Sequence, residues 1–268
     1  MNWVVLVLLC AGGAFCGHYA SGELGAQLAV GAPNAPVLVE LFTSEGCPFC
    51  PPADELIGRL SQTQPVPGVQ IIALKEHVDY WNRDDWRDPF SSPQFTKRQH
   101  GYATAFEKDQ VYTPQMVVDG RAAFNGIGVT HAKQMIAQAA HLPKVPVRLE
   151  WVSAAADGPV TLRVRVDPLL PADASETTEV LLAVTEDHLR SEARAGRNEK
   201  KAPEHFAVVR TLQSLGNMKP QAGVPFSAQT EIALDKSWKR SDLRVVVFLQ
   251  QIRSRHVLGS AVTPLPAL

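Results

Sequence analysis

Two cysteines separated by two residues constrain this chain more than any other feature of its sequence. Cys47-Pro48-Phe49-Cys50 follows a mostly apolar run at residues 37–43 and precedes a helical pattern that is expected to begin near Pro52. A strand before the pair and a helix after it place the cysteines at the carboxyl end of a strand, where open α/β sheets bind ligands and carry chemistry. Two thiols at this spacing can close a small disulfide ring or hold a metal ion.

The segment after the cysteines predicts a strand–helix–strand unit. Residues 53–60 place apolar side chains on one helical face, and residues 69–74 form the next apolar run. Such a unit is expected to have parallel strands and a right-handed crossover. Pro51-Pro52 follows the pair directly, and a residue before proline avoids the α region, so Cys50 is expected to lie in a turn before the helix.

The following segment, residues 76–110, is an insertion rich in aromatic and acidic residues. Its first part contains His77, Asp79, Trp81 and Trp86, and it lacks a clear period. These residues come just after the second strand, at the sheet edge that carries Cys47. Three interpretations stay open: a structural cap, a recognition surface over the cysteines, and a metal site. Later in the insertion, Ser92-Pro93 predicts a capped helix start, with the helix running to about residue 106.

Thr113-Pro114 opens the next predicted strand, at residues 111–118. Taken alone, a proline at a strand start is expected to be trans. Asp119-Gly120 is a strong two-residue hairpin signal, which predicts a returning strand at residues 121–125. Thr130 is expected to cap a last helix that ends near residue 140.

The rest of the chain has a β pattern. Alternating apolar runs and turn signals predict six or seven strands and a β-sandwich. The expected strands are residues 147–152, 160–166, 180–185, 206–212, 226–234, 243–251 and 257–262. No cysteine and no obvious catalytic cluster occurs in this part of the sequence.

The N-terminus predicts export from the cytoplasm. An apolar run followed by small residues covers residues 3–15, too short to span a membrane and typical of a signal peptide. A lipid-modified Cys16 and a buried N-terminal strand are alternatives. If Cys10 and Cys16 leave with a signal peptide, the mature chain keeps one cysteine pair in an oxidising compartment. The expected organisation is a signal peptide at 1–20, a linker at 21–35, an α/β domain at 36–142 and a β-sandwich-like domain at 147–268.

The charge composition argues against one class of partner. The net charge is −1 and no long basic run is present, so nucleic-acid binding through bulk electrostatics is not expected. Nor is a stable membrane span expected once the signal is removed.

The cysteine pair has a defined chemistry if it is redox active. Cys47 is the candidate nucleophile, and Cys50 is the resolving thiol that attacks a mixed disulfide. A helix N-terminus favours a thiolate, although the intervening prolines and the acidic Asp54 and Glu55 leave only a moderate expected fall in the thiol pKa. Glu40 interrupts the first strand and is either a paired carboxylate or a buried acid that moves a proton beneath the thiols.

The order of these segments resembles the thioredoxin fold. Cys47-Pro48-Phe49-Cys50 is similar to the Cys-Pro-aromatic-Cys of glutaredoxins, and Thr113-Pro114 resembles the thioredoxin-type cis-proline position, which favours a cis bond here. More narrowly, the chain resembles a secreted bacterial thioredoxin-like family of uncharacterised function. That likeness lies in Cys-Pro-Pro-Ala-Asp at 50–54, His-Val-Asp-Tyr-Trp at 77–81 and Tyr-Thr-Pro-Gln-Met-Val-Val-Asp-Gly at 112–120.

The leading functional prediction is an extracytoplasmic thiol-disulfide oxidoreductase that acts on protein or peptide thiols and disulfides. Cys47 and Cys50 would be catalytic, with Phe49, Trp81, Thr113 and Pro114 contacting the substrate and no cofactor required. One alternative is a copper- or zinc-binding protein using Cys47, Cys50 and His77. Another is a binding module in which the disulfide is a permanent cross-link. The oligomeric state and the substrate are left open.

Overall fold

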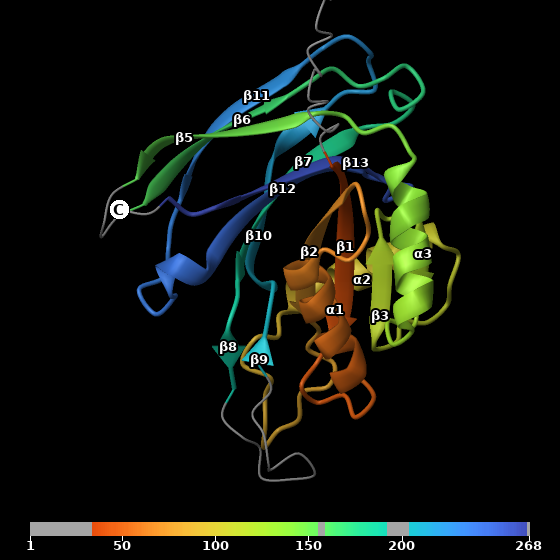
Figure 1. The fold of residues 1–268 in the computed structure, drawn as a ribbon, viewed down its shortest axis with the longest axis vertical. Helices are drawn as coiled ribbons and strands as arrows, with labels where there is room; N and C mark the ends of the chain where they lie inside the picture. Colours follow the sequence, from red (N-terminus) through yellow and green to blue (C-terminus); the bar gives the residue numbers. More distant parts are fainter. Residues whose placement is uncertain (1–33, 155–158, 192–203, 267–268) are drawn as a thin grey trace, which may run out of the picture. The chain divides into compact units, whose positions relative to one another are not determined.

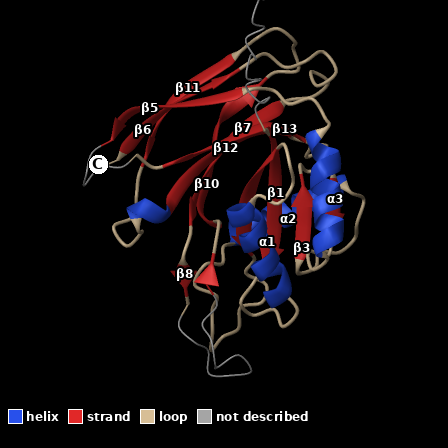
Figure 2. Ribbon diagram, viewed as in Figure 1, coloured by secondary structure: helices blue, strands red, loops and turns tan. Residues whose placement is uncertain are grey.

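The computed structural model describes residues 34–154, 159–191 and 204–266. The predicted signal peptide and most of the predicted linker lie outside these residues. In the described ranges, no helix has the length and apolar character needed to cross a membrane. The fold is mixed α/β, with one large mixed sheet and a smaller antiparallel sheet (Figure 2).

The first half follows the order expected from the sequence. Its strands and helices are β1 (Ala35–Thr43), α1 (Pro51–Thr63), β2 (Val69–His77), α2 (Pro93–Ala105), β3 (Gln115–Val118), β4 (Ala122–Phe124) and α3 (Val129–Ala140). β1 pairs in parallel with β2 and antiparallel with β3. The cysteine pair therefore follows a central strand whose last seven residues are buried.

The two faces of β1 have different neighbours. Val37, Val39 and Leu41 pack into one core with buried residues of α1 and α3. Phe42 points to the other face and packs with Tyr102 of α2. Figure 1 shows α1 and α3 in front of these strands and α2 behind them. This alternation separates side chains beneath the cysteine-bearing helix from those that face α2.

The second half contributes strands to the same large sheet. They are β7 (Thr178–Glu186), β10 (Val208–Met218), β12 (Leu243–Gln251) and β13 (Val257–Pro264), and the sheet order is β13-β12-β7-β10-β2-β1-β3-β4. β10 joins β2 in parallel through a single register pair, Val208 with Lys75. The sheet is therefore continuous between the two halves, and the predicted division into two domains stays a prediction.

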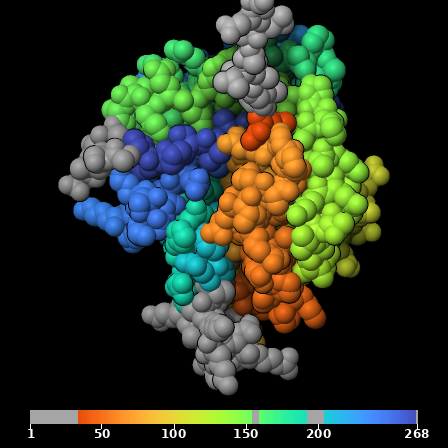
Figure 3. All heavy atoms as spheres, in the orientation of Figure 1, coloured from red at the N-terminus to blue at the C-terminus, as the bar shows by residue number. Residues whose placement is uncertain are grey.

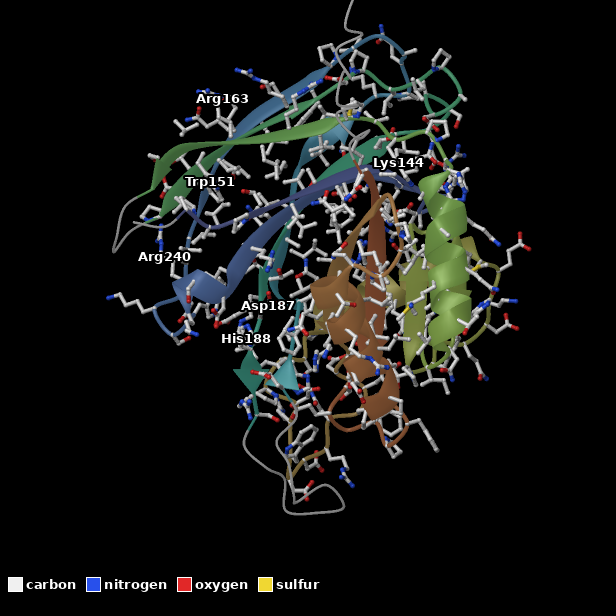
Figure 4. All side chains as sticks on the ribbon, in the orientation of Figure 1. Lys144, Trp151, Arg163, Asp187, His188 and Arg240 are labelled. Atoms are coloured by element: carbon white, nitrogen blue, oxygen red, sulfur yellow. A yellow bond between two sulfur atoms is a disulfide. The ribbon has the colours of Figure 1, made fainter. Side chains whose placement is uncertain are left out.

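A three-stranded sheet covers part of the large one. β5 (Val147–Ala154), β6 (Val160–Val166) and β11 (Phe226–Ile232) form it in the order β11-β6-β5. Alternate buried residues of β6 share a core with β7 and β12, as in two facing sheets. Trp151, labelled in Figure 4, packs against this core. The predicted β strands thus form, but they divide between this sheet and the large one.

Two helix starts differ from the sequence-based expectation. Cys50 is the N-cap of α1 and lies before the helix, as expected, but it has α-region dihedral angles, which a residue before proline was expected to avoid. α1 begins at Pro51, one residue before the predicted start. The Cys50 carbonyl accepts hydrogen bonds from the backbone N–H groups of Ala53 and Asp54, which satisfies donors of the first turn. Gly128, rather than Thr130, is the N-cap of α3. The predicted Ser92 cap of α2 is confirmed.

Candidate functional site

Cys47 and Cys50 form a disulfide in the loop between β1 and α1. Their Cα atoms lie 5.5 Å apart, and the backbone N–H of Cys47 donates to the Ser44 carbonyl. Both cysteines are buried, at 2% and 0% exposure, whereas the Phe49 side chain between them is 72% exposed. The loop thus presents an aromatic ring to solvent and keeps its sulfur atoms beneath the surface.

The Thr113–Pro114 peptide bond is cis, as the resemblance predicts. The insertion lies against this position, because Trp81 Nε1 donates a 2.7 Å hydrogen bond to Thr113 Oγ1. The same tryptophan lies against the cysteine loop. A Cβ placed on Gly46 would come within 2.8 Å of Trp81 Cβ, so only glycine fits there without displacement. Trp81 therefore contacts both the residue before Cys47 and the residue before Pro114.

Asp88 anchors the insertion to the cysteine loop. Its Oδ2 accepts hydrogen bonds from Ser44 Oγ and the Glu45 backbone N–H, and it lies 2.8 Å from His77 Nδ1. Burial would raise the pKa of Asp88. The hydrogen bond and charge of His77, with the backbone N–H groups of Glu45 and Phe90, outweigh burial and lower this pKa to about 2. Asp88 is therefore an ionised, structural partner of the loop at neutral pH.

His77, the predicted metal ligand, contacts Asp88 instead of the cysteines. Its ring is buried and its Nδ1 faces Asp88, while Cys47 and Cys50 are joined to each other. In residues 34–154, 159–191 and 204–266, no group of three or more His, Cys, Asp or Glu side chains is arranged to hold a metal ion. The metal alternative draws no support from this geometry.

Glu40 belongs to a buried network on the α2 face of the sheet. Arg98 of α2 donates a 2.7 Å hydrogen bond to Glu40, and the Tyr102 hydroxyl donates to the second carboxylate oxygen. Gln250 of β12 bonds both Arg98 and Tyr102, so the network joins the two halves of the chain. Since α1 packs on the opposite face, Glu40 is a paired carboxylate here, and its role as a proton relay for the thiols stays a prediction.

Glu76 is a second acid in this network. Arg98 Nε lies 3.2 Å from Glu76 Oε1, without the geometry of a hydrogen bond. Burial raises the pKa of Glu76 well above its ordinary value, Arg98 opposes that rise, and the neighbouring Glu40 adds to it. One arginine thus faces two buried carboxyl groups, and burial favours the protonated form of Glu76.

A third buried group lies near the cysteine loop and includes residues that sequence reasoning missed. Lys75 of β2 is fully buried beside Asp54 of α1, and His205 of β9 (Glu204–His205) is buried beside Glu45. Lys75 directly follows the apolar run at residues 69–74, and its place at the end of a buried strand was the available signal. No local pattern marks His205, because its partner Glu45 lies far away in the sequence.

Two solved structures resemble this fold. A protein from Agrobacterium tumefaciens, AGR_C_4864, is 23% identical, with a TM-score of 0.66, 87% of this chain covered and 95% of that one. HBP35 of Porphyromonas gingivalis is 15% identical, with a TM-score of 0.65, 88% of this chain covered and 76% of that one. These likenesses show the fold.

Sequence comparison gives a family without an assigned activity. No curated protein matches the chain. The model of one family, described as "Protein of unknown function (DUF1223)", matches residues 38–250, which include the cysteine pair, the insertion, the cis-proline and most of the β strands. The chain therefore belongs to the DUF1223 family.

Proposed function

We propose that this protein is an extracytoplasmic thiol-disulfide oxidoreductase that acts on protein or peptide thiols. The observation that carries the proposal is the Cys47–Cys50 disulfide at the start of α1, directly after a central strand. This is the position at which helix N–H groups and the helix dipole stabilise a thiolate. The expected thioredoxin-like domain, residues 36–142, supplies the supporting order of strands and helices.

The chemistry is a two-step exchange. A client thiolate attacks Cys47 Sγ, the Cys47–Cys50 bond breaks, and Cys50 leaves as a thiolate. A second client thiolate then attacks the client sulfur of the mixed disulfide and releases Cys47. The client loses two electrons and forms a disulfide, and the cysteine pair gains them as a dithiol. The same steps in reverse reduce a client disulfide.

The residues around the pair support roles in client binding. Phe49 is exposed between the cysteines, and Trp81 bridges the cysteine loop and Thr113. We assign Phe49, Trp81, Thr113 and Pro114 to the contact with an extended client segment. The export prediction supports a location outside the cytoplasm, where disulfides persist.

The burial of both cysteines favours one other function. A sulfur pair beneath the surface is also what a permanent cross-link in a binding module requires. The two functions differ in reduction potential, since structural disulfides lie below about −300 mV and catalytic pairs between about −270 and −120 mV.

The deciding experiment is equilibration of the mature protein, free of metal, in glutathione buffers. A potential within the catalytic span supports exchange, and its value tells an oxidant from a reductant. A reduction potential below about −300 mV would rule out the oxidoreductase and support a binding module with a permanent disulfide. Cys47→Ser should abolish turnover, and Cys50→Ser should accumulate a mixed disulfide with client protein, because its resolving thiol is missing.

A further inference from the structure

We propose that the open edge of β2 at Ala73 forms a binding site for a small molecule that carries a primary carboxamide and a carboxylate. The site is a cavity of about 410 Å³, lined by residues of α1, β2, β7, β12 and β13. Its volume is within the range of small-molecule sites. The inference is independent of the redox function proposed for the cysteine pair.

The large sheet is incomplete beside β2. β10 is the neighbour of β2 on the edge away from β1, but the two strands share a single register pair, Val208 with Lys75. No strand among the described residues pairs with the earlier part of this edge. Figure 3 shows atoms of the last strands, in blue, beside the orange atoms of the first half. Residues of β12 and β13 line the cavity from that side.

The backbone of Ala73 lacks a hydrogen-bond partner at this edge. The N–H and C=O groups of successive strand residues point to alternate edges, so those of Ala73 point the same way as those of Ile71 and Lys75. The N–H groups of Ile71 and Lys75 are bonded, whereas no group in the described ranges bonds Ala73 there. Ala73 is 6% exposed and lines the cavity. Because buried backbone groups are almost always paired, this donor and acceptor require a partner that enters the cavity.

Gln64 shows which chemical group fits such an edge. Its Nε2 donates a 3.0 Å hydrogen bond to the Ile71 carbonyl, and its Oε1 accepts a 2.7 Å hydrogen bond from the Ile71 N–H. One carboxamide thus satisfies both backbone groups of the residue two positions before Ala73. A second carboxamide, from a ligand, can bind Ala73 in the same way. A carboxylate cannot replace it, because an ionised carboxylate has no hydrogen to donate to the carbonyl.

Arg244 gives the cavity its preference for an anion. It is the one charged residue among the described residues that line the cavity. Its Nε donates a 3.0 Å hydrogen bond to Oδ2 of Asp187, the acid labelled in Figure 4, and Asp187 Oδ1 accepts from the Ala207 N–H. The two terminal nitrogens of the guanidinium have no bonding partner in the described part of the chain. They can bind a carboxylate with the bidentate geometry that arginine favours.

The first test is the hydrogen exchange of backbone amides in the protein labelled with ¹⁵N. Without ligand, the Ala73 N–H should exchange at least about tenfold faster than the N–H groups of Ile71 and Lys75, because both of these are hydrogen-bonded. An Ala73 amide as protected as its two neighbours would overturn the inference, because the group would already have a partner.

The probes are the mono-amides of succinic, glutaric and adipic acid, which carry both groups at three spacings. Near neutral pH, at least one mono-amide should shift the Ala73 amide resonance saturably and slow its hydrogen exchange. The matching diacids lack the donor and the diamides lack the charge, so both should bind about tenfold more weakly. Equal affinity of the three classes would refute the proposed ligand. No effect of any mono-amide on Ala73 would show a cavity that holds only water, and would also refute it.

Arg244→Gln tests the contact with the carboxylate. It should weaken mono-amide binding by about tenfold and leave diamide binding within about twofold, because only the charged group loses its partner. The matched control is Arg253→Gln, since Arg253 is an exposed arginine that pairs with Glu176 at 3.7 Å and does not line the cavity. It should leave both affinities unchanged. Equal losses in the two variants would assign binding to the overall charge and overturn the site. If Arg244→Gln does not fold, the comparison of probe classes on the wild type decides the question.

Discussion

Trp81 Nε1 donates a hydrogen bond of 2.7 Å to Thr113 Oγ1, which ties the insertion to the residue before the cis-proline. Trp81 also lies against Gly46, the residue before Cys47. The two segments proposed to contact a client are therefore held at a fixed separation by one side chain from the insertion. The insertion is therefore in contact with both of these segments through Trp81.

Removing this hydrogen bond should weaken the fold modestly and slow exchange. Trp81→Phe and Thr113→Val should each lower the free energy of unfolding by about 1 kcal/mol, the usual net value for one hydrogen bond. The double variant should cost less than the sum of the two, because both changes delete the same contact. Urea unfolding of the four proteins measures this coupling. Additive effects would show that the contact contributes nothing.

Gly120 in the β3–β4 turn should be among the glycines least tolerant of substitution. It has a φ of 63°, and an added Cβ would lie 1.8 Å from the carbonyl oxygen of Arg255, in the turn between β12 and β13. Gly68 is a matched control, because it has a φ of 72° with open space around it. Gly68→Ala should cost about 1 kcal/mol for the left-handed backbone alone, and Gly120→Ala distinctly more. Equal falls in melting temperature for Gly68→Ala and Gly120→Ala would mean that the β3–β4 turn can move away from Arg255 at no cost.

Asp88→Asn should remove a pH-dependent part of the stability. The folded pKa of about 2 lies below the ordinary value of 3.8, so the unfolded chain binds the proton more tightly. The contribution is present above about pH 4 and is lost as pH falls toward 2. It amounts to about 2 kcal/mol. The gap in unfolding free energy between wild type and variant should therefore narrow as pH falls through this range. A constant gap would assign the loss to packing alone.

Local sequence signals were sufficient for the path of the chain through the cysteine site. The apolar run before Cys47, the Ser92-Pro93 start and the Asp119-Gly120 turn each act over a few residues, and the structure has β1, α2 and the β3–β4 hairpin at these places. Strand pairing in the second half was different. Alternation marks a residue as belonging to a strand, but it does not say which strand lies beside it. The extension of the large sheet by β10 and its neighbours was therefore not predicted.

The polar partners of the site were missed for a related reason. Arg98 reaches Glu40 and His205 reaches Glu45 only after helices and strands have packed. Neither pair has a fixed spacing that a sequence pattern could reveal. Asp88 and His77 are closer in sequence than these two pairs. The segment that contains Asp88 has no helical or strand periodicity, however, so the sequence does not predict the direction of its side chain. The disulfide pair was predictable because its two partners lie within one turn.

Glu76→Gln should flatten the dependence of stability on pH. The folded pKa of Glu76 is raised above its ordinary value of 4.5, so above about pH 4.5 the unfolded chain releases a proton that the folded protein keeps. Wild-type stability from this group is complete below that pH and falls as pH rises, by at most about 1.4 kcal/mol per pH unit. The variant lacks this loss. Urea unfolding between about pH 4.5 and 7.5 measures it.

The control for this prediction is Glu55→Gln. Glu55 is an exposed acid of α1 that pairs with Arg59 at 3.4 Å. Its removal should leave the shape of the stability curve unchanged. Parallel curves for the wild type and Glu76→Gln would show that Glu76 is ionised in the folded protein.

Phe49→Ala should separate client binding from the chemistry of the pair. The side chain is 72% exposed, so its truncation should change the free energy of unfolding by less than about 0.5 kcal/mol. If Phe49 contacts the client, KM for a protein thiol or disulfide should rise several-fold, since exposed aromatic side chains often contribute strongly to recognition. The rate with a small disulfide such as oxidised glutathione should change little. Val224→Ala, another exposed apolar side chain at 50%, should leave both reactions unaltered. An equal fall in rate with protein and small-molecule substrates would mean that Phe49 affects the reactivity of the cysteines and not the recognition of the client.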